Sequence, residues 1–314
     1  MPHVQVVHTT RYSYVRPVRL MPHRLMVRPQ DSHDLRLNEA TLAVDPAPGS
    51  TRWAHDVFGN SICMLDWPAG METASLRIVS RLDLSHYPAG PGLPRATLQP
   101  EAELFPFSYS ADEVADLARL SERHLADPER QVDAWARRFV AGSDVGTLAM
   151  LEAMTHAIHQ EFRYAAREEM GTQTPVETLS LGSGACRDFA LLMMEAVRSL
   201  GLAARFVSGY LYNDEGGSSR GGGTTHAWCS VYLPGAGWVE YDPTNGLVAG
   251  RNLVRVAVTR TPEQAVPISG GFIGSGNDFA GLTVDVRVTV PGRAPVGRAG
   301  GSPGQDFLRE AEPV

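Results

Sequence analysis

The chain of 314 residues contains no lysine, because all 28 of its basic residues are arginine. It therefore has no side-chain amine with which it could crosslink itself. Cysteine is also scarce, since only Cys63, Cys186 and Cys229 are present, an odd number without the spacing of a disulfide framework. Unpaired thiols in a chain of this size are typical of a reducing compartment. We therefore expect a cytoplasmic protein.

Long apolar runs are missing as well. No stretch approaches the roughly 18 uninterrupted apolar residues of a membrane-spanning helix, and no basic segment followed by an apolar run marks a signal peptide. The net charge of −7 gives no general attraction to phosphate backbones. These features predict a protein that binds neither membrane nor nucleic acid, and they leave its oligomeric state open.

The first part of the chain has the pattern of short strands, rich in β-branched and aromatic residues and separated by turn-forming segments. We expect residues 1–90 to form a small β-sandwich domain. A linker over 91–109 follows, marked by the proline- and glycine-rich segment 88–94. The strand candidates are 4–14, 20–27, 35–44, 61–67 and 74–84.

After Ser110 the hydrophobic period changes from two to nearer 3.6, which indicates helices. We expect an α+β domain over 110–290 and a disordered tail over 291–314, where proline, glycine and charge dominate. The Asp127-Pro128 and Thr174-Pro175 pairs read as helix starts. Helices are predicted over 111–126, 128–140, 147–162, after Thr174 and over 186–200, and strands over 203–212, 225–233, 237–241, 253–259 and 282–290.

Cys186 stands where a glycine-containing loop turns into the last of these helices. The first backbone N–H groups of a helix are unpaired, and together with the positive end of the helix dipole they favour a thiolate over a thiol. A structural cysteine would normally lie within the apolar face of the helix instead. We predict that Cys186 is a nucleophile.

His226 follows 40 residues later at the head of a predicted strand, and Asp242 follows after 16 more residues. That spacing suits a hairpin that sets a carboxylate beside an imidazole, as a base and its orienting group require. Each residue also has a simpler explanation, because a histidine can cap a strand and Asp-Pro is a common turn. A zinc site is a weaker alternative, since no paired ligand spacing supports it.

Further residues could complete such a site. The backbone N–H of Cys186 is a candidate oxyanion donor, and Tyr164 and Gln160 are candidate side-chain donors. Trp228 shares a strand face with His226 and is expected to shield the ion pair or line the cleft. Cys229 should point to the opposite face, into the core.

The chain resembles the transglutaminase-like superfamily of cysteine proteases and amidases. The similar blocks, in the expected order, are Gly184–Ala190, Ala203–Tyr210, His226–Trp228 and Asp242–Gly246. The first domain resembles the N-terminal β-domain of the bacterial subgroup, through His8–Tyr14, Pro22–Arg24 and Asp56–Asn60.

This resemblance implies a papain-like core in which Cys186 begins a helix packed on an antiparallel sheet carrying His226 and Asp242. It also implies acyl transfer through a thioester, without a metal or an organic cofactor. We expect hydrolysis of a peptide or protein amide bond. An acyltransferase that accepts an amine is one alternative, and a non-catalytic binding module that has kept the fold is another.

Overall fold

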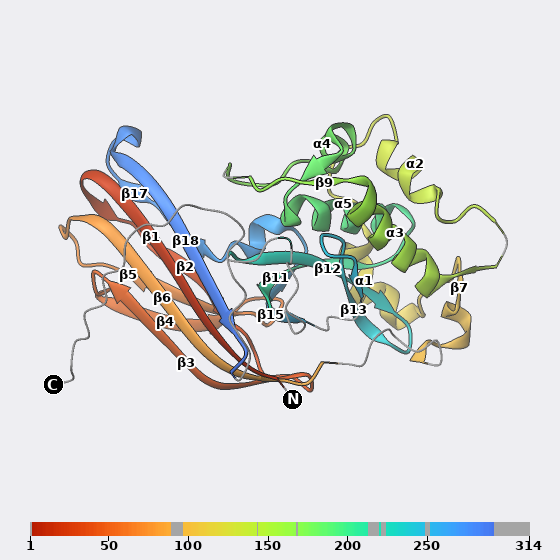
Figure 1. Cartoon of the computed structure of the whole chain (residues 1–314), viewed down its shortest axis with the longest axis horizontal. Coiled ribbons are helices and arrows are strands. Elements are labelled where there is room, and N and C mark those ends of the chain that lie inside the picture. The colour runs from red at the N-terminus through yellow and green to blue at the C-terminus, as the bar shows by residue number, and fades with distance from the viewer. Residues whose placement is uncertain are drawn as a thin grey trace.

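The computed structural model describes residues 2–88, 97–142, 144–167, 169–212, 220, 224–248 and 252–291. Long strands occupy one end of the molecule, and helices packed on a shorter sheet occupy the other (Figure 1). Residues 91–96 of the predicted linker, most of the glycine-rich segment before His226 and the predicted tail from residue 292 lie outside the described residues. No described helix has the length and apolar character needed to cross a bilayer.

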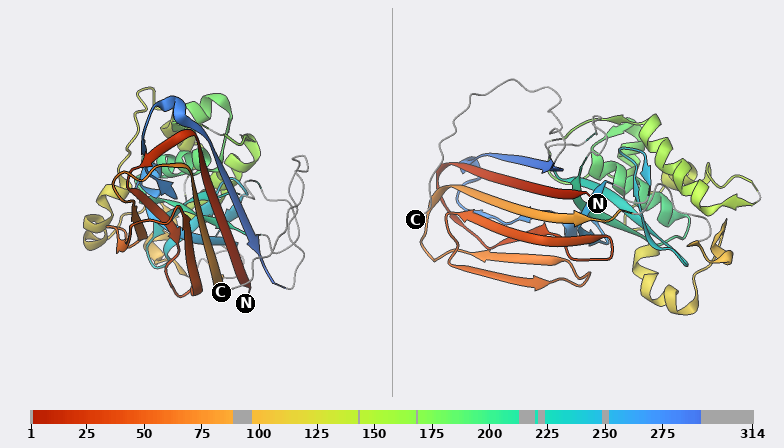
Figure 2. Two further views of the ribbon diagram at one scale, coloured as in Figure 1. Left: turned by 90° about the vertical axis from the view of Figure 1, so that its left-hand side faces the viewer. Right: turned by 60° about the horizontal axis from the view of Figure 1, so that its bottom comes forward.

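The N-terminal region is a sandwich of two sheets, as the sequence predicts. Its core contains Tyr14 and Leu76 from one sheet and Leu25 and Leu65 from the other, all buried. Figure 2 shows the long strands extending away from the helices. One sheet holds β3 (Leu35–Asp45), β6 (Thr73–His86), β1 (His3–Leu20), β17 (Phe272–Ile273) and β18 (Phe279–Thr289), and the other holds β4 (Ser50–His55), β5 (Ser61–Asp66), β2 (His23–Arg28) and β16 (Ile268–Ser269).

Several strands of this region differ from the sequence expectation, β4 and β18 among them. β4 has a mostly exposed, polar pattern at the edge of its sheet, and the sequence predicts no strand there. β18 lies within the range expected for the second domain, yet it pairs with β1 from Gln5 to Tyr14. β1 pairs with β6 along one edge and with β18 along the other. The last strand of the chain therefore belongs to the sheet of the first domain (Figure 1).

The second region is built on an antiparallel sheet in the order β14-β13-β12-β11-β15. Helix α5 packs against β12 and β11, and nearly every residue of α5 is buried. The sheet strands are β11 (Ala204–Leu211), β12 (His226–Leu233), β13 (Gly237–Asp242), β14 (Leu247–Val248) and β15 (Leu253–Thr259). The helices are α1 (Ala111–Ser121), α2 (Gln131–Arg137), α3 (Thr147–Glu161), α4 (Pro175–Leu181) and α5 (Cys186–Ser199).

The described part of this region also contains two short strand pairs and two 3-10 turns, and a further 3-10 turn lies beside β1 in the N-terminal region. β9 (Arg163–Tyr164) runs parallel to β10 (Ser183–Gly184), which leads directly into α5. The other short elements are β7 (Leu104–Phe105), β8 (Val145–Gly146), η2 (Pro100–Ala102), η3 (Pro262–Ala265) and η4 (Gly276–Asp278).

One predicted helix start is confirmed and the other is wrong. Thr174 caps α4 in a capping box with Glu177. Asp127-Pro128 does not begin α2, which starts at Gln131 after Arg130 in the left-handed region. The Asp127 carboxylate instead accepts backbone N–H bonds from Gln131 and Val132 at 2.8 and 3.1 Å. Asp127 therefore pairs the free N–H groups at the start of α2, although it lies before the helix and a turn separates the two.

The two regions share a buried apolar interface. Val4, Val6 and Leu84 from the N-terminal sheet pack with Tyr210 and Val254 from the central sheet. Polar groups cross it too, since the Nδ1 atom of His8 lies 3.0 Å from the hydroxyl oxygen of Tyr210. The first domain therefore packs directly on strands β11 and β15 of the second.

Candidate active site

Cys186 is the first residue of α5, and 9% of its surface is exposed. Ala185 precedes it in an extended conformation, and the Ala185 carbonyl accepts the N–H groups of Asp188 and Phe189. Within the described part of the chain, the N–H groups of Cys186 and Arg187 have no acceptor. The sulfur atom therefore lies beside unpaired donors at the positive end of the helix, the position that the sequence predicts.

Asp188 holds this helix start in place. Its buried carboxylate accepts the N–H of Ala185 at 2.8 Å and that of Gln173 at 2.8 Å, and it pairs with Arg167 at 2.9 Å. Gly184 is needed here, because a β-carbon at this position would lie 2.9 Å from the β-carbon of Asp188. Asp188 thus joins the α5 start to the segment that precedes α4.

His226 and Asp242 are brought together by the β12–β13 hairpin, as their spacing predicts. His226 begins β12 and Asp242 ends β13, and both side chains are completely buried. The Nε2 atom of His226 donates to Oδ2 of Asp242 at 2.8 Å. A carboxylate so placed fixes the tautomer of the ring and stabilises its protonated form.

The other ring nitrogen of His226, Nδ1, is buried and has no well-aligned hydrogen-bond partner among the described residues. Burial by itself would lower the pKa of His226, but the charge and hydrogen bond of Asp242 and the interaction with the Cys186 side chain raise it. The imidazole is therefore held between the carboxylate and the thiol. This arrangement favours the imidazolium form beside the Cys186 side chain.

Asp242 is satisfied by the turn that follows it. Its Oδ1 atom accepts the N–H of Thr244 at 2.9 Å, and its Oδ2 atom accepts the side-chain amide of Asn245 at 2.9 Å as well as His226. Burial would raise the pKa of the Asp242 carboxyl group, but the charge of His226 and these hydrogen bonds outweigh burial and lower it. The sequence did not single out Asn245 as a functional residue.

Tyr164 lies near the thiol, whereas Gln160 does not join the site. Tyr164 is paired with Gly184, two residues before Cys186. Burial raises the pKa of Tyr164 to about 12, with further contributions from Cys186 and Asp242 that Arg187 opposes. Gln160 is exposed on α3, and no interaction within the described residues links it to Cys186.

Trp228 stacks on the imidazole of His226, with 5.9 Å between ring centroids and 27° between ring planes. It is completely buried, so it covers one face of the ring and does not line an open cleft. Cys229 points to the other side of β12, into the core beneath α5. The predicted alternation of this strand is therefore confirmed.

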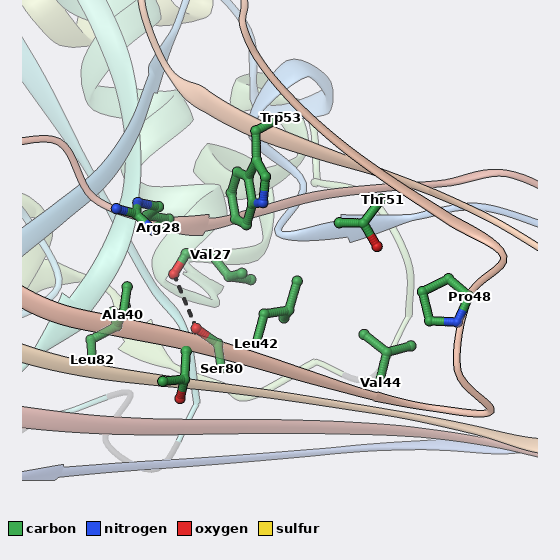
Figure 3. A pocket seen from close by; sticks show the side chains of 11 residues that line it. Val27, Arg28, Ala40, Leu42, Val44, Pro48, Thr51, Trp53, Ser80 and Leu82 are labelled. Carbon is green, nitrogen blue, oxygen red and sulfur yellow. Dashed lines mark hydrogen bonds between the residues drawn. The ribbon is translucent and has the colours of Figure 1, made fainter.

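A cavity of about 430 Å³ lies in the N-terminal region, away from these residues (Figure 3). Residues of β2, β3, β4 and β6 line it, among them Val27, Leu42, Trp53 and Ser80. The Arg28 guanidinium lies 5.6 Å from the centre of the Trp53 ring at this cavity. None of the lining residues belongs to the site around Cys186.

Several known proteins are similar to this chain. An uncharacterized protein of Mycobacterium tuberculosis (strain ATCC 25618 / H37Rv) is 29% identical over 297 residues, covering 90% of this chain and 91% of the relative. A protein-glutamine gamma-glutamyltransferase of Pseudomonas aeruginosa is 30% identical over 132 residues, which cover 39% of this chain and 18% of that protein.

A solved structure described as a "putative cysteine protease" from Cytophaga hutchinsonii superimposes with a TM-score of 0.69 over 95% of both chains. The two sequences are 17% identical, so this likeness shows the fold alone.

Family models match both regions of the chain. Residues 4–84 match the bacterial transglutaminase-like N-terminal region, and residues 133–243 match the transglutaminase-like superfamily. The second match includes Cys186, His226 and Asp242. The chain therefore belongs to the transglutaminase-like superfamily and carries the N-terminal region of its bacterial type.

Proposed function

We propose that the protein transfers an acyl group through a thioester on Cys186. The observation that carries this proposal is the completely buried His226–Asp242 pair beside a thiol at the start of α5. Cysteine, histidine and aspartate so arranged can act as nucleophile, general acid–base and orienting group. Similarity to the superfamily supports the same chemistry.

In the first half of the proposed reaction, the Cys186 thiolate attacks the carbonyl carbon of an amide. The carbon–nitrogen bond then breaks, and the His226 imidazolium gives its proton to the departing amine. In the second half, neutral His226 takes a proton from water, the water oxygen attacks the thioester carbon, and Cys186 leaves as thiolate. The products are an amine and a carboxylic acid, and the enzyme returns to its starting state.

The oxyanion formed in each half needs hydrogen-bond donors. The unpaired N–H of Cys186 can supply one, because it stands at the start of a helix next to the reacting sulfur. The Tyr164 hydroxyl can supply a second, since a pKa of about 12 keeps it protonated at neutral pH. We assign these two groups as the hydrogen-bond donors to the oxyanion and assign no such role to Gln160.

The proposed substrate is a peptide or protein amide, and the proposed acceptor is water. An amine acceptor is the second candidate, favoured by the similarity of part of the chain to a protein-glutamine gamma-glutamyltransferase. Both reactions use the same acyl-enzyme and differ in what resolves it. A cytoplasmic location stays a prediction.

The test is a thiol-directed acyl probe followed by substrate turnover. We expect the probe to label the wild type and not Cys186→Ala, while Cys63→Ala, which removes a buried thiol of the first domain, keeps the label. Ammonia release from glutaminyl peptides, measured with and without a primary amine, then separates hydrolysis from transamidation. Lack of labelling by every probe in a folded wild type would instead favour a binding module.

A further inference from the structure

The turn after β13 binds the Asp242 carboxylate through a side chain as well as through backbone N–H groups. Oδ2 of Asp242 accepts two donors, the His226 ring at 2.8 Å and the Asn245 side-chain amide at 2.9 Å. Asn245 therefore touches the same oxygen atom that orients the imidazole. Oδ1 is held separately by the backbone N–H of Thr244 at 2.9 Å. Because the terminal torsion of a carboxylate is soft, these contacts on both oxygen atoms together fix its rotation.

The orientation of the Asn245 amide is itself determined by a neighbour. The backbone N–H of Arg220 donates to Oδ1 of Asn245 at 2.9 Å, and the Arg220 carbonyl accepts from Nδ2 at 3.3 Å. Because Oδ1 must face a donor, Nδ2 must face the carboxylate of Asp242. A flipped amide would set two oxygen atoms against each other, so the donor role of Nδ2 is forced.

The end of α3 supports both partners. The Arg220 guanidinium donates to the His159 carbonyl at 3.1 Å, and the Nδ1 atom of His159 lies 2.8 Å from the Thr244 carbonyl oxygen. Gly246 lies over this helix end with a φ of +66°, and a β-carbon there would lie 3.3 Å from the His156 ring. The last turn of α3 and the turn over 242–246 therefore form one packed unit.

From this chain of contacts we infer that Asn245 is a positioning residue, which aims Oδ2 of Asp242 at His226 and is itself aimed by Arg220. The inference rests on the proposed acyl transfer at Cys186. Asn245 touches no reacting atom. Its amide dipole stabilises the ionised carboxylate, and its loss leaves the imidazole less strictly oriented.

Two substitutions test this role. Asn245→Ala removes the amide, and Asn245→Asp keeps the size and the acceptor for Arg220 while it replaces the donor by a second carboxylate. We expect each to lower kcat/KM roughly 10- to 100-fold through kcat, the usual range for one hydrogen bond to a charged group. Asn277→Ala, at an exposed asparagine far along the chain, should leave turnover unchanged.

The pH profile separates positioning from a merely structural role. Without the donated hydrogen bond Asp242 ionises less readily, so the acid limb of kcat/KM should move to higher pH in Asn245→Ala. It should move further in Asn245→Asp, because a like charge opposes ionisation. Folded variants that keep both the wild-type rate and the wild-type acid limb would overturn the inference.

A spectroscopic readout keeps this inference distinct from the proposed reaction. The proton on Nε2 of His226 should give a downfield NMR signal in the wild type that weakens or shifts in both Asn245 variants. If no acyl substrate reacts with the wild type, the proposed function fails and this signal alone decides the positioning role. An unchanged signal in either folded variant refutes the role of Asn245.

Discussion

The side chain of Asn60 makes with Val258 the two hydrogen bonds that a neighbouring strand would make. Its Nδ2 atom donates to the Val258 carbonyl at 2.7 Å, and the Val258 N–H donates to its Oδ1 atom at 2.8 Å. Val258 lies in β15, the edge strand of the central sheet. Asp56 fixes the turn that carries Asn60, accepting its backbone N–H and its amide at 2.9 Å. The first domain thus covers an edge of the second.

Asn60→Ala should therefore destabilise the whole chain. It removes the partners of both backbone groups of Val258, a half-buried residue, which costs about 1–3 kcal/mol for each group that water does not reach. The measurement is urea unfolding followed by far-UV circular dichroism, with Asn277→Ala as the matched control. A stability equal to that of the control would show that the contact between the domains is dispensable.

Asp242→Asn should abolish most activity and change its pH dependence. The carboxylate raises the pKa of His226, so the imidazolium persists to higher pH than an isolated histidine would allow. Without this charge the pKa of His226 falls, and the alkaline limb of kcat/KM should move to lower pH. We expect a loss of about two to four orders of magnitude in kcat at neutral pH. An alkaline limb at the wild-type pH would contradict the proposed imidazolium.

His8 should make the fold sensitive to mild acid. Burial at the interface lowers its pKa from 6.5 to about 4, so the unfolded chain binds a proton between these values that the folded chain does not. Stability is fully present above pH 6.5 and falls by up to about 3 kcal/mol as the pH approaches 4. His8→Gln should flatten this slope in urea titrations at several pH values. The exposed His33→Gln should not alter it.

Gly209→Ala should be among the most damaging single changes to the second domain. A β-carbon at Gly209 would lie 2.1 Å from the Val254 carbonyl oxygen and 2.8 Å from the ring of Trp228, which stacks on His226. Overpacking of this kind costs about 1–3 kcal/mol or more. Thermal unfolding measures the loss, and Gly281→Ala is the control, because nothing lies within 4 Å of a β-carbon there. Similar melting of the two variants would contradict the predicted clash.

Features that depend on nearby residues were predictable from the sequence. The start of α5 at Cys186 and the capping box at Thr174 follow from side chains within a few positions of each other. The pairing of His226 with Asp242 follows from a hairpin of suitable length. In each case the order and spacing of the residues predict the contact, because local backbone geometry brings their side chains together.

Other features depend on contacts between distant segments. The sequence determined by itself which residues could form a nucleophile, a base and an orienting carboxylate, and that a strand-rich segment precedes them. Only the tertiary structure decided that β18 returns to β1, that Asn60 covers the edge of β15, and that Asn245 and Arg220 hold Asp242. The Asn245–Asp242 contact spans only three positions, but the Arg220 contact that orients Asn245 and the other pairings join residues 25 to more than 270 positions apart. No local pattern specifies which polar group a distant one will meet.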